Sequence, residues 1–231
     1  MALDMKKKNL LLVGASSEIG TAIVRQAESN DYQVISTQRS GSTPGLYMDV
    51  TSDESVKSAI TQVIADYGVI DAVIYAPALS NDGLIHTLND EAWSSVFDVN
   101  VFGAARVARY LIPHFIKARK GVLQFISSTA AVRGATGAAP YSCSKAALNA
   151  LALNIANDYG RFNIRAYTVM PGFVDGGMLT HLSDEKKQLL AREPALKRLA
   201  TPYEIAHLCV ATLDVSYLTG TAITLDGGLS R

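Results

Sequence analysis

Short, almost entirely apolar runs alternate with longer helical patterns along nearly the whole chain. The runs lack the polar alternation of a half-exposed strand, so we expect strands that are buried on both faces. Strands that alternate with helices form a parallel sheet with helices on both faces and right-handed crossovers. The pattern therefore predicts an α/β protein with a doubly wound parallel sheet. The predicted strands cover residues 9–15, 32–37, 71–77, 121–128, 164–172 and 222–228.

Helical patterns fill the gaps between the strands, and the chain length limits how many cores they build. With 231 residues, an α/β protein commonly keeps one core and one domain. We therefore expect a single domain over residues 1–231. The least regular segment, 173–199, is predicted to be a mobile flap over a binding site. The predicted helices cover residues 19–27, 52–67, 101–118, 141–159 and 202–213.

Charge and apolar content exclude several classes of function. Lys and Arg number 21, as do Asp and Glu, so the basic surplus of proteins that bind nucleic acid or anionic membranes is absent. No run approaches the roughly 20 apolar residues of a membrane span, so we expect a cytoplasmic protein. Cys143 and Cys209 fit a reducing compartment, although a single disulfide is also compatible with the sequence. The four histidines lack metal-ligand spacing, so no metal is expected.

The sequence GASSEIG, residues 14–20, lies between the first strand and the first helix. Such a loop places backbone N–H groups and a helix amino end where a pyrophosphate could bind, but an ordinary tight turn has the same sequence. With Ser17 as N-cap, Glu18 falls in the first helical turn, where its carboxylate can point to solvent. The alternative is that Glu18 lies close enough to repel phosphates. The loop residues expected to contact the phosphates are Gly14, Ser16, Ser17, Ile19 and Gly20.

The end of the second strand indicates which dinucleotide the loop would bind. An acidic residue at this place suits a free ribose hydroxyl, whereas an arginine suits a 2′-phosphate. Arg39 stands here with no carboxylate beside it in the sequence, and its planar donor fork suits phosphate. The residue favours NADP(H) over NAD(H), and the alternative is a solvated loop arginine.

Four polar residues form a candidate catalytic set. Tyr141 and Lys145 lie four residues apart at the start of a helical pattern, hence on one face of the helix. An ammonium one turn away would favour tyrosinate and lower the pKa of the phenol from about 10. Ser128 ends the fourth strand, where its hydroxyl could hold a substrate oxygen, and Asn100 lies near the start of another helix. Ser128 and Asn100 each also suit a helix cap or a turn.

Together these residues resemble the short-chain dehydrogenase/reductase family, and the resemblance runs from Leu10 almost to the C-terminus. Asn100, Ser128, Tyr141 and Lys145 match the order and spacing of the family's tetrad. Further matches are MDV at 48–50, MPGFV at 170–174, RLATPYEIA at 198–206 and YLTGTAITLDGG at 217–228. The resemblance implies a Rossmann-type fold. It also implies cofactor contacts by Asp49, Val50, Ala76, Tyr141, Lys145, Pro171, Gly172 and Val174.

The resemblance further implies a mechanism. NADPH delivers hydride to a carbonyl carbon, Tyr141 protonates the carbonyl oxygen, and Ser128 donates a hydrogen bond to that oxygen. Lys145 tunes the tyrosine and binds the nicotinamide ribose. Asn100 holds a water molecule that links the lysine to solvent.

Three departures from the family pattern fall in segments that contact the cofactor. Glu18 replaces the middle glycine of the loop, which we expect to be harmless. YAPA at 75–78 replaces NNAG, so a bulky tyrosine and a proline without an N–H group enter the site. Gly176 stands where a threonine or serine usually contacts the carboxamide, which could loosen the nicotinamide or the flap. The alternative to an enzyme is therefore a binding or regulatory protein of this fold with weakened cofactor affinity.

The overall pattern is most similar to 3-oxoacyl-acyl-carrier-protein reductases, including the loop LSNDGLIHTLNDEAW at 79–93. This implies reduction of a 3-oxoacyl thioester, whereas other relatives reduce small ketones, sugars or polyketide intermediates. Arg119 matches a basic position that contacts the acyl carrier protein, but Phe162 occupies the second such position, with Arg161 adjacent. The resemblance also implies a homotetramer that pairs through helices 101–118 and 141–159 and through the last strand.

Overall fold

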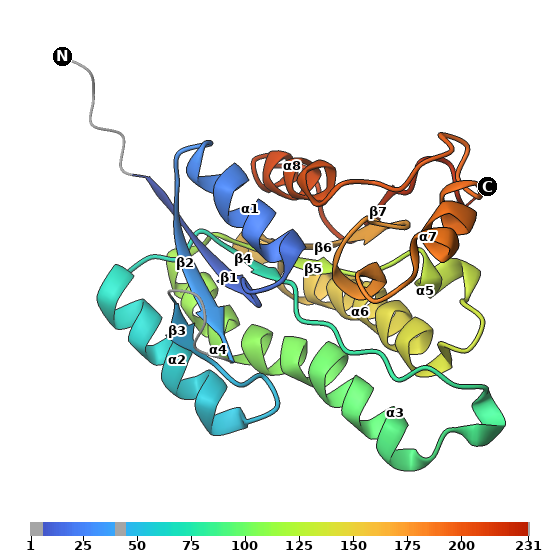
Figure 1. Ribbon diagram of the computed structural model, residues 1–231. Helices are drawn as coiled ribbons and strands as arrows, with labels where there is room; N and C mark the ends of the chain where they lie inside the picture. Colours follow the sequence, from blue (N-terminus) through green and yellow to red (C-terminus); the bar gives the residue numbers. More distant parts are fainter. Residues whose placement is uncertain (1–6, 40–44, 231) are drawn as a thin grey trace.

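Seven parallel strands form one sheet with the order β3-β2-β1-β4-β5-β6-β7 in the computed structural model, which describes residues 7–39 and 45–230. The predicted doubly wound fold is confirmed (Figure 1). Only the two-residue strand β3 was not predicted, because so short a strand has no periodicity to detect. The strands are β1 (Lys8–Val13), β2 (Tyr32–Gln38), β3 (Leu46–Tyr47), β4 (Ala72–Tyr75), β5 (Gly121–Ile126), β6 (Ile164–Pro171) and β7 (Ala222–Leu225).

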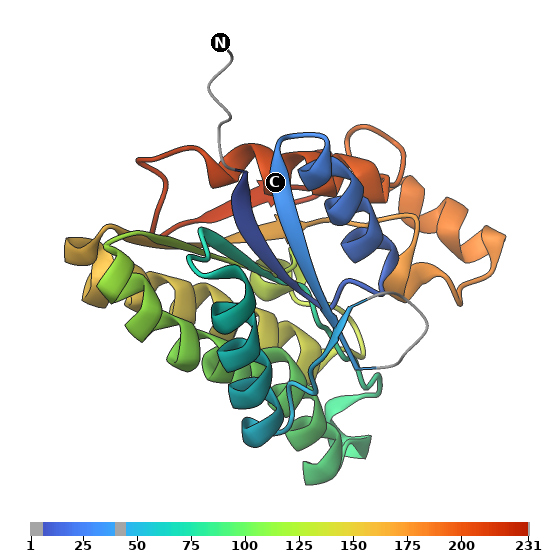
Figure 2. The same ribbon diagram turned by 90° about the vertical axis from the view of Figure 1, so that its left-hand side faces the viewer.

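Helices cover both faces of the sheet, which explains why the strand sequences are apolar throughout. On one face Leu10 and Leu12 of β1 pack into a core with α1 and α8, and on the other Leu11 and Val13 pack with α2, α4 and α6. Figures 1 and 2 show these two helix layers on either side of the sheet. The covering helices are α1 (Glu18–Glu28), α8 (Pro202–Leu213), α2 (Asp53–Tyr67), α4 (Gly103–Ala118) and α6 (Ala139–Tyr159).

Three further helices, α3 (Asp90–Phe97), α5 (Ala130–Arg133) and α7 (Asp184–Ala191), were not predicted. Among them, α5 and α7 have no buried residue and α3 buries only Val96, so their sequences carry little apolar periodicity. Short helical turns fill several connections. They are Ile85–Thr87, Asp98–Phe102, Gly160–Phe162 and Gly177–Leu179.

The strand order reverses at β1, which lies between β2 and β4. At such a point the loops after neighbouring strands run to opposite faces and leave a crevice beyond the carboxyl ends of the strands. The loops that follow β1, β4, β5 and β6 therefore share this edge. None of the helices in the described part of the chain is long and apolar enough to cross a bilayer, and Cys143 and Cys209 are free thiols.

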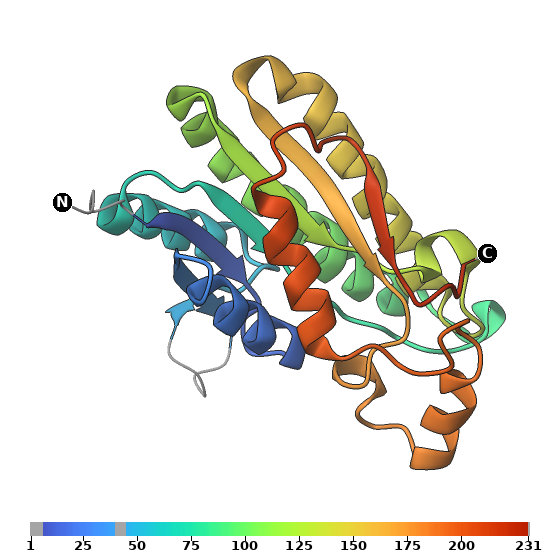
Figure 3. The same ribbon diagram turned by 90° about the horizontal axis from the view of Figure 1, so that it is seen from above.

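The segment that follows β6 lies beyond the end of that strand, as the orange ribbon in Figure 3 shows. Two hydrogen bonds tie its base: Asp175 N donates to Ala200 O (2.8 Å) and Ala200 N donates to Phe173 O (2.9 Å). Between these ties, the turn Gly177–Leu179 and α7 bury none of their residues. This construction is compatible with a flap, which stays a prediction for 173–199.

Candidate active site

The loop after β1 has the geometry of a tight strand-to-helix turn. Gly14 adopts a positive φ of 82°, and the Ser17 hydroxyl accepts a hydrogen bond from Gly20 N (2.9 Å), which confirms Ser17 as the N-cap of α1. A Cβ on Gly20 would lie 2.6 Å from Gly14 O, so only glycine allows the helix to approach the strand this closely. The first amides of α1, those of Glu18 and Ile19, lie at the amino end of the helix, where they have no intrahelical partner and can bind a phosphate.

The Glu18 side chain makes a contact that was not predicted. It lies in the first turn of α1 as predicted, but its carboxylate accepts a hydrogen bond from Gly177 N at 2.8 Å. The residue is exposed, as predicted, and the carboxylate makes this contact at the surface of the protein. Ser16, which precedes the N-cap in the loop, is also exposed.

Tyr141, Lys145 and Ser128 meet at the carboxyl edge of the sheet. The helix α6 begins at Ala139, two residues earlier than predicted, and Pro140 lies in its first turn, which proline suits. Tyr141 then lies in that turn and forms a hydrogen bond with Ser128, which follows β5. Lys145 is fully buried; its Nζ donates to Ile126 O (2.6 Å) and lies 5.6 Å from the centroid of the Tyr141 ring.

The protonation of this pair differs from the prediction. Burial raises the pKa of the Tyr141 phenol, the hydrogen bond with Ser128 lowers it, and the negative charge of Asp82 raises it further. Burial also lowers the pKa of Lys145 to about 7. The expected lowering of the tyrosine pKa by an ammonium is therefore wrong for this structure, because desolvation disfavours the charged form of both groups. Near neutral pH the phenol keeps its proton, as a proton donor must.

Asn100 lies within a π-helical turn, Asp98–Phe102, between α3 and α4. The side chain is buried: its Oδ1 accepts from Leu79 N (2.7 Å), and its Nδ2 donates to Leu79 O (2.9 Å) and to the Ser144 hydroxyl (2.8 Å). Ser144 in turn donates to Tyr141 O (2.7 Å). Asn100 therefore fastens the loop after β4 to the helix that carries Tyr141. Nothing in the sequence spacing singled out Ser144.

The departure YAPA does not fill the site with a tyrosine side chain. Tyr75 is buried at the end of β4, and its hydroxyl donates to Val99 O (2.5 Å) in the π-helical turn. A Cβ on Gly103 would overlap this hydroxyl, so the absence of a side chain at Gly103 makes room for the tyrosine. Pro77 lies beside the loop after β1, where a Cβ on Gly14 would be only 3.0 Å from the proline ring. Tyr75 and Pro77 therefore fit because their neighbours, Gly103 and Gly14, have no side chain.

We expect Tyr75→Phe to lower the free energy of unfolding by about 1–3 kcal/mol, because Val99 O loses a buried donor while the ring still fits. Urea unfolding of the variant measures this difference. Tyr47→Phe, at an exposed position on β3, is the control and leaves the stability unchanged. A Tyr75→Phe protein as stable as the parent would contradict this role of the hydroxyl.

Arg39 and Asp49 stand on the β2 side of the crevice. Arg39 is exposed just beyond β2, next to residues 40–44, which lie outside the described part of the chain. The Asp49 carboxylate accepts from Thr51 N (3.0 Å) and the Thr51 hydroxyl (2.7 Å), which lower its pKa, and the charge of Arg39 lowers it further. Val50 is buried. An exposed cation is thus available at the place where a 2′-phosphate would lie.

The ends of β4 and β6 close the remaining side of the crevice. Ala76 N donates to Val13 O (3.0 Å), which keeps the chain beside β1 after β4 ends. Pro171 O accepts from Thr129 N (3.0 Å), and Val174 is buried. A Cβ on Gly172 would lie 2.8 Å from Asp226, so this close passage requires glycine.

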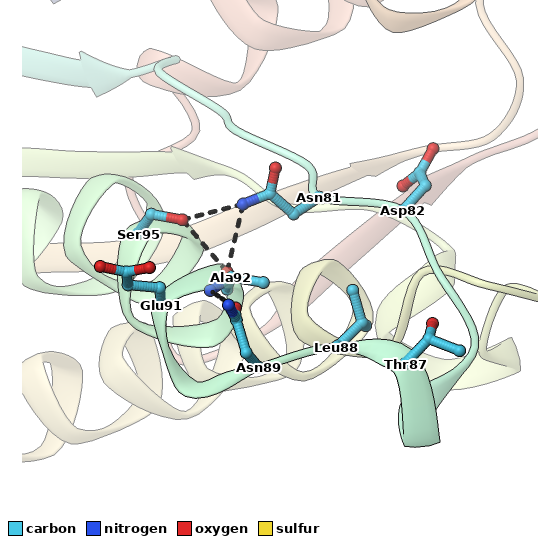
Figure 4. Close-up of a pocket in the computed structure, with 8 residues that line it drawn as sticks. All are labelled: Asn81, Asp82, Thr87, Leu88, Asn89, Glu91, Ala92 and Ser95. Atoms are coloured by element: carbon cyan, nitrogen blue, oxygen red, sulfur yellow. Dashed lines mark hydrogen bonds between the residues drawn. The ribbon is translucent and has the colours of Figure 1, made fainter.

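A hollow lies between residues 81–82 and the start of α3 (Figure 4). Asn81 Nδ2 crosses it to the Ser95 hydroxyl (2.9 Å) and Ala92 O (3.3 Å). None of Asn100, Ser128, Tyr141 and Lys145 lines it. The hollow therefore belongs to the segment that flanks the candidate site, not to the site itself.

The arrangement fits a dinucleotide laid along the crevice. The open amino end of α1 offers N–H groups to a pyrophosphate, with an exposed Arg39 towards β2. Towards β5, the hydrogen-bonded hydroxyls of Tyr141 and Ser128 lie where a reacting group would be placed. Within residues 7–39 and 45–230, no group of three or more His, Cys, Asp or Glu side chains could hold a metal ion.

Known proteins resemble this chain in sequence and in structure. The family model described as Enoyl-(Acyl carrier protein) reductase matches residues 14–230. The 3-oxoacyl-[acyl-carrier-protein] reductase FabG of Chlamydia muridarum is 32% identical over 219 residues, which cover 94% of this chain and 88% of that protein.

Two solved structures have the same fold. Ligand-free aldohexose dehydrogenase of Thermoplasma acidophilum matches with a TM-score of 0.90 and 28% identity, over 98% of this chain and 95% of its own. ElxO with NADP bound matches with a TM-score of 0.91 and 22% identity, over 96% and 98% of the two chains.

Proposed function

Because the chain belongs to the short-chain dehydrogenase/reductase family and is thus an oxidoreductase, we propose that it is an NADPH-dependent carbonyl reductase. Its substrate is a 3-oxoacyl thioester or a similar ketone, which it converts to the hydroxy product. One observation carries the proposal: the Tyr141 phenol, kept protonated by burial, is hydrogen-bonded to Ser128 at the crevice, above a buried lysine.

Each residue of the set has a defined task in this reaction. When bound, the reduced nicotinamide supplies the hydride. Tyr141 donates its proton to the substrate oxygen, and Ser128 donates a hydrogen bond that stabilises the charge developing there. Lys145, with its pKa near 7, returns a proton to the tyrosine. Asn100 keeps one lone pair on Oδ1 for the water that links the lysine to solvent.

The remaining residues hold the cofactor. The first amides of α1 bind the pyrophosphate, and Arg39 binds the 2′-phosphate. The fold itself is one that holds NADP in a structural neighbour, ElxO. The predicted contacts of the loop after β1 and of the strand ends are Gly14, Ser16, Ser17, Ile19, Gly20, Asp49, Val50, Ala76, Pro171, Gly172 and Val174.

We expect Arg39→Ala to raise the KM for NADPH by about 10- to 100-fold, because a charge-assisted contact with the 2′-phosphate is lost. The KM for NADH changes by less than about twofold, since NADH lacks that phosphate. Steady-state kinetics with both cofactors measures the difference. Arg25→Ala, an exposed arginine in the last turn of α1, is the control. Equal effects on both cofactors would contradict the role of Arg39.

The substrate class rests on the relatives. FabG of Chlamydia muridarum is named for 3-oxoacyl groups, whereas the matched family model is described by an enoyl reduction and one structural neighbour is an aldohexose dehydrogenase. A panel of acetoacetyl-CoA, crotonyl-CoA and aldohexoses, each with NADPH and NADH, separates the three. We expect acetoacetyl-CoA with NADPH to give the highest kcat/KM. Turnover confined to crotonyl-CoA or to sugars would overturn the substrate assignment.

An acyl carrier protein is the carrier we propose for this thioester. Arg119, exposed at the end of α4, is the contact, with Arg161 as a second cation over the Phe162 ring, 4.9 Å from its centroid.

The alternative function is a binding module, that is, the same chain without affinity for the cofactor. A fluorescence titration with NADPH separates the two, because a binding module gives no saturable signal.

We further propose a homotetramer. Apolar side chains are exposed where the family resemblance places the contacts: Phe102 beside α4, Leu153 on α6 and Tyr217 before β7. Light scattering coupled to gel filtration measures the mass in solution. A monomer would overturn this assembly.

A further inference from the structure

Two of the three departures from the family pattern, Glu18 and Gly176, meet in the fold. They are far apart in the sequence, but the Glu18 carboxylate accepts from Gly177 N at 2.8 Å. Gly176 adopts a φ of 146°, which suits only glycine, and a Cβ there would overlap the Glu18 carboxylate oxygen. Figure 3 shows the start of α1 beside the segment that follows β6. The absence of a side chain at 176 is therefore what lets the carboxylate reach the next amide.

The two ends of this contact differ in how firmly they are held. Glu18 belongs to a helix that is capped by Ser17 and packed on the sheet through Ile23 and Ala27. The turn Gly177–Leu179, by contrast, buries no residue. A hydrogen bond from a backbone amide to an ionised carboxylate is stronger than a neutral one. The contact therefore holds the weakly anchored turn against a firmly anchored helix.

We propose that Glu18 is a positioning residue that latches the turn 177–179 to the start of α1, and that Gly176 is its required partner. The inference rests on the proposed function, because the latched turn borders the crevice that would hold the cofactor. It also explains how a carboxylate is tolerated among phosphate-binding residues. The Glu18 carboxylate is engaged by the Gly177 amide at 2.8 Å and so has a partner outside the loop after β1.

Hydrogen exchange of the protein without cofactor tests the latch directly. In Glu18→Ala we expect the Gly177 amide to exchange at least about 10-fold faster, because a hydrogen bond of ordinary strength already accounts for that factor and one to a carboxylate is stronger. Glu18→Gln keeps an acceptor oxygen at the same reach and should stay within about threefold of the parent. Unchanged exchange in Glu18→Ala would overturn the latch. This measurement needs no activity, so its outcome is separate from that of the proposed function.

Kinetics test the positioning role. We expect Glu18→Ala to raise the KM for NADPH by about fivefold or more while kcat stays within about twofold, and Glu18→Gln to restore most of the affinity. An unchanged KM would overturn the role in cofactor binding.

The pairing with Gly176 is tested by a double-mutant cycle. Gly176→Ala carries backbone strain in either background, but it overlaps the carboxylate only when Glu18 is present. We therefore expect Gly176→Ala to raise the KM for NADPH at least about threefold more in the parent than in Glu18→Ala. Equal factors in the two backgrounds would show independent residues and overturn the matched pair.

Discussion

We expect Tyr141→Phe to lower kcat by about 10²- to 10⁴-fold, the range for loss of a positioned proton donor. The ring keeps its place in the first turn of α6, so only the hydroxyl that bonds Ser128 is removed. NADPH affinity should therefore change by less than about twofold. Steady-state assays of thioester reduction measure kcat, and a fluorescence titration with NADPH measures the affinity, both on one preparation.

Tyr67→Phe is the matched control, because Tyr67 is exposed at the end of α2 and belongs to neither the candidate site nor the proposed interface. It should leave both kcat and affinity unchanged. A Tyr141→Phe enzyme with parental turnover would show that another group protonates the substrate. Loss of NADPH affinity together with turnover would instead show that the hydroxyl serves cofactor binding.

We expect Lys145→Met to abolish detectable turnover and at the same time to stabilise the fold. The lysine is fully buried, and its Nζ donates a hydrogen bond to Ile126 O. Burial lowers its pKa from 10.5 to about 7, so the folded protein disfavours the ammonium. Methionine fills a similar volume without the charge. Below pH 7 the free energy of unfolding should rise by about 1–3 kcal/mol, after the lost hydrogen bond is counted.

The stability advantage of Lys145→Met is expected to depend on pH. Between about pH 7 and 10 the unfolded chain binds a proton on Lys145 that the folded chain does not, so the stability of the parent rises with pH. The advantage of Lys145→Met is therefore largest below pH 7 and shrinks at higher pH. Urea unfolding of both proteins without cofactor, at several pH values, measures it. A variant that is less stable than the parent at every pH would contradict the inference that the buried Lys145 destabilises the fold.

Much of the fold was predictable because the buried sheet leaves a strong signal. Each face of β1 packs into its own core, so Leu10 to Val13 are apolar without interruption. The same reasoning fails for β3, which is two residues long, and for α7, which buries no residue. A sequence predicts a helix or a strand through the spacing of its buried apolar residues, and β3 and α7 bury no residue.

The candidate site was predictable as a set of residues but not as a set of contacts. Tyr141 and Lys145 share a helix face, which follows from their spacing. The bond between Tyr75 and Val99 O and the contact between Glu18 and Gly177 depend on segments distant in the sequence. In both cases a glycine, Gly103 or Gly176, makes room for the larger side chain, and no local pattern pairs them.

The pKa of Tyr141 shows the same limit. Spacing predicts an ammonium near the phenol, but it does not predict how deeply both groups are buried. Burial raises the pKa of the phenol, outweighs the lowering by the hydrogen bond with Ser128, and keeps the phenol protonated. This state suits reduction, in which the tyrosine gives up a proton.

The transfer of deuterium from NADPH labelled at its transferable position tests the central claim most directly. With acetoacetyl-CoA as substrate, the proposed function predicts a 3-hydroxybutyryl thioester that carries deuterium on the carbon bearing the hydroxyl group. The product is identified by mass spectrometry and NMR, with Tyr141→Phe run in parallel as the inactive reference. Absence of labelled hydroxy product from the parent protein, or label found only in a saturated product from crotonyl-CoA, would contradict a carbonyl reductase.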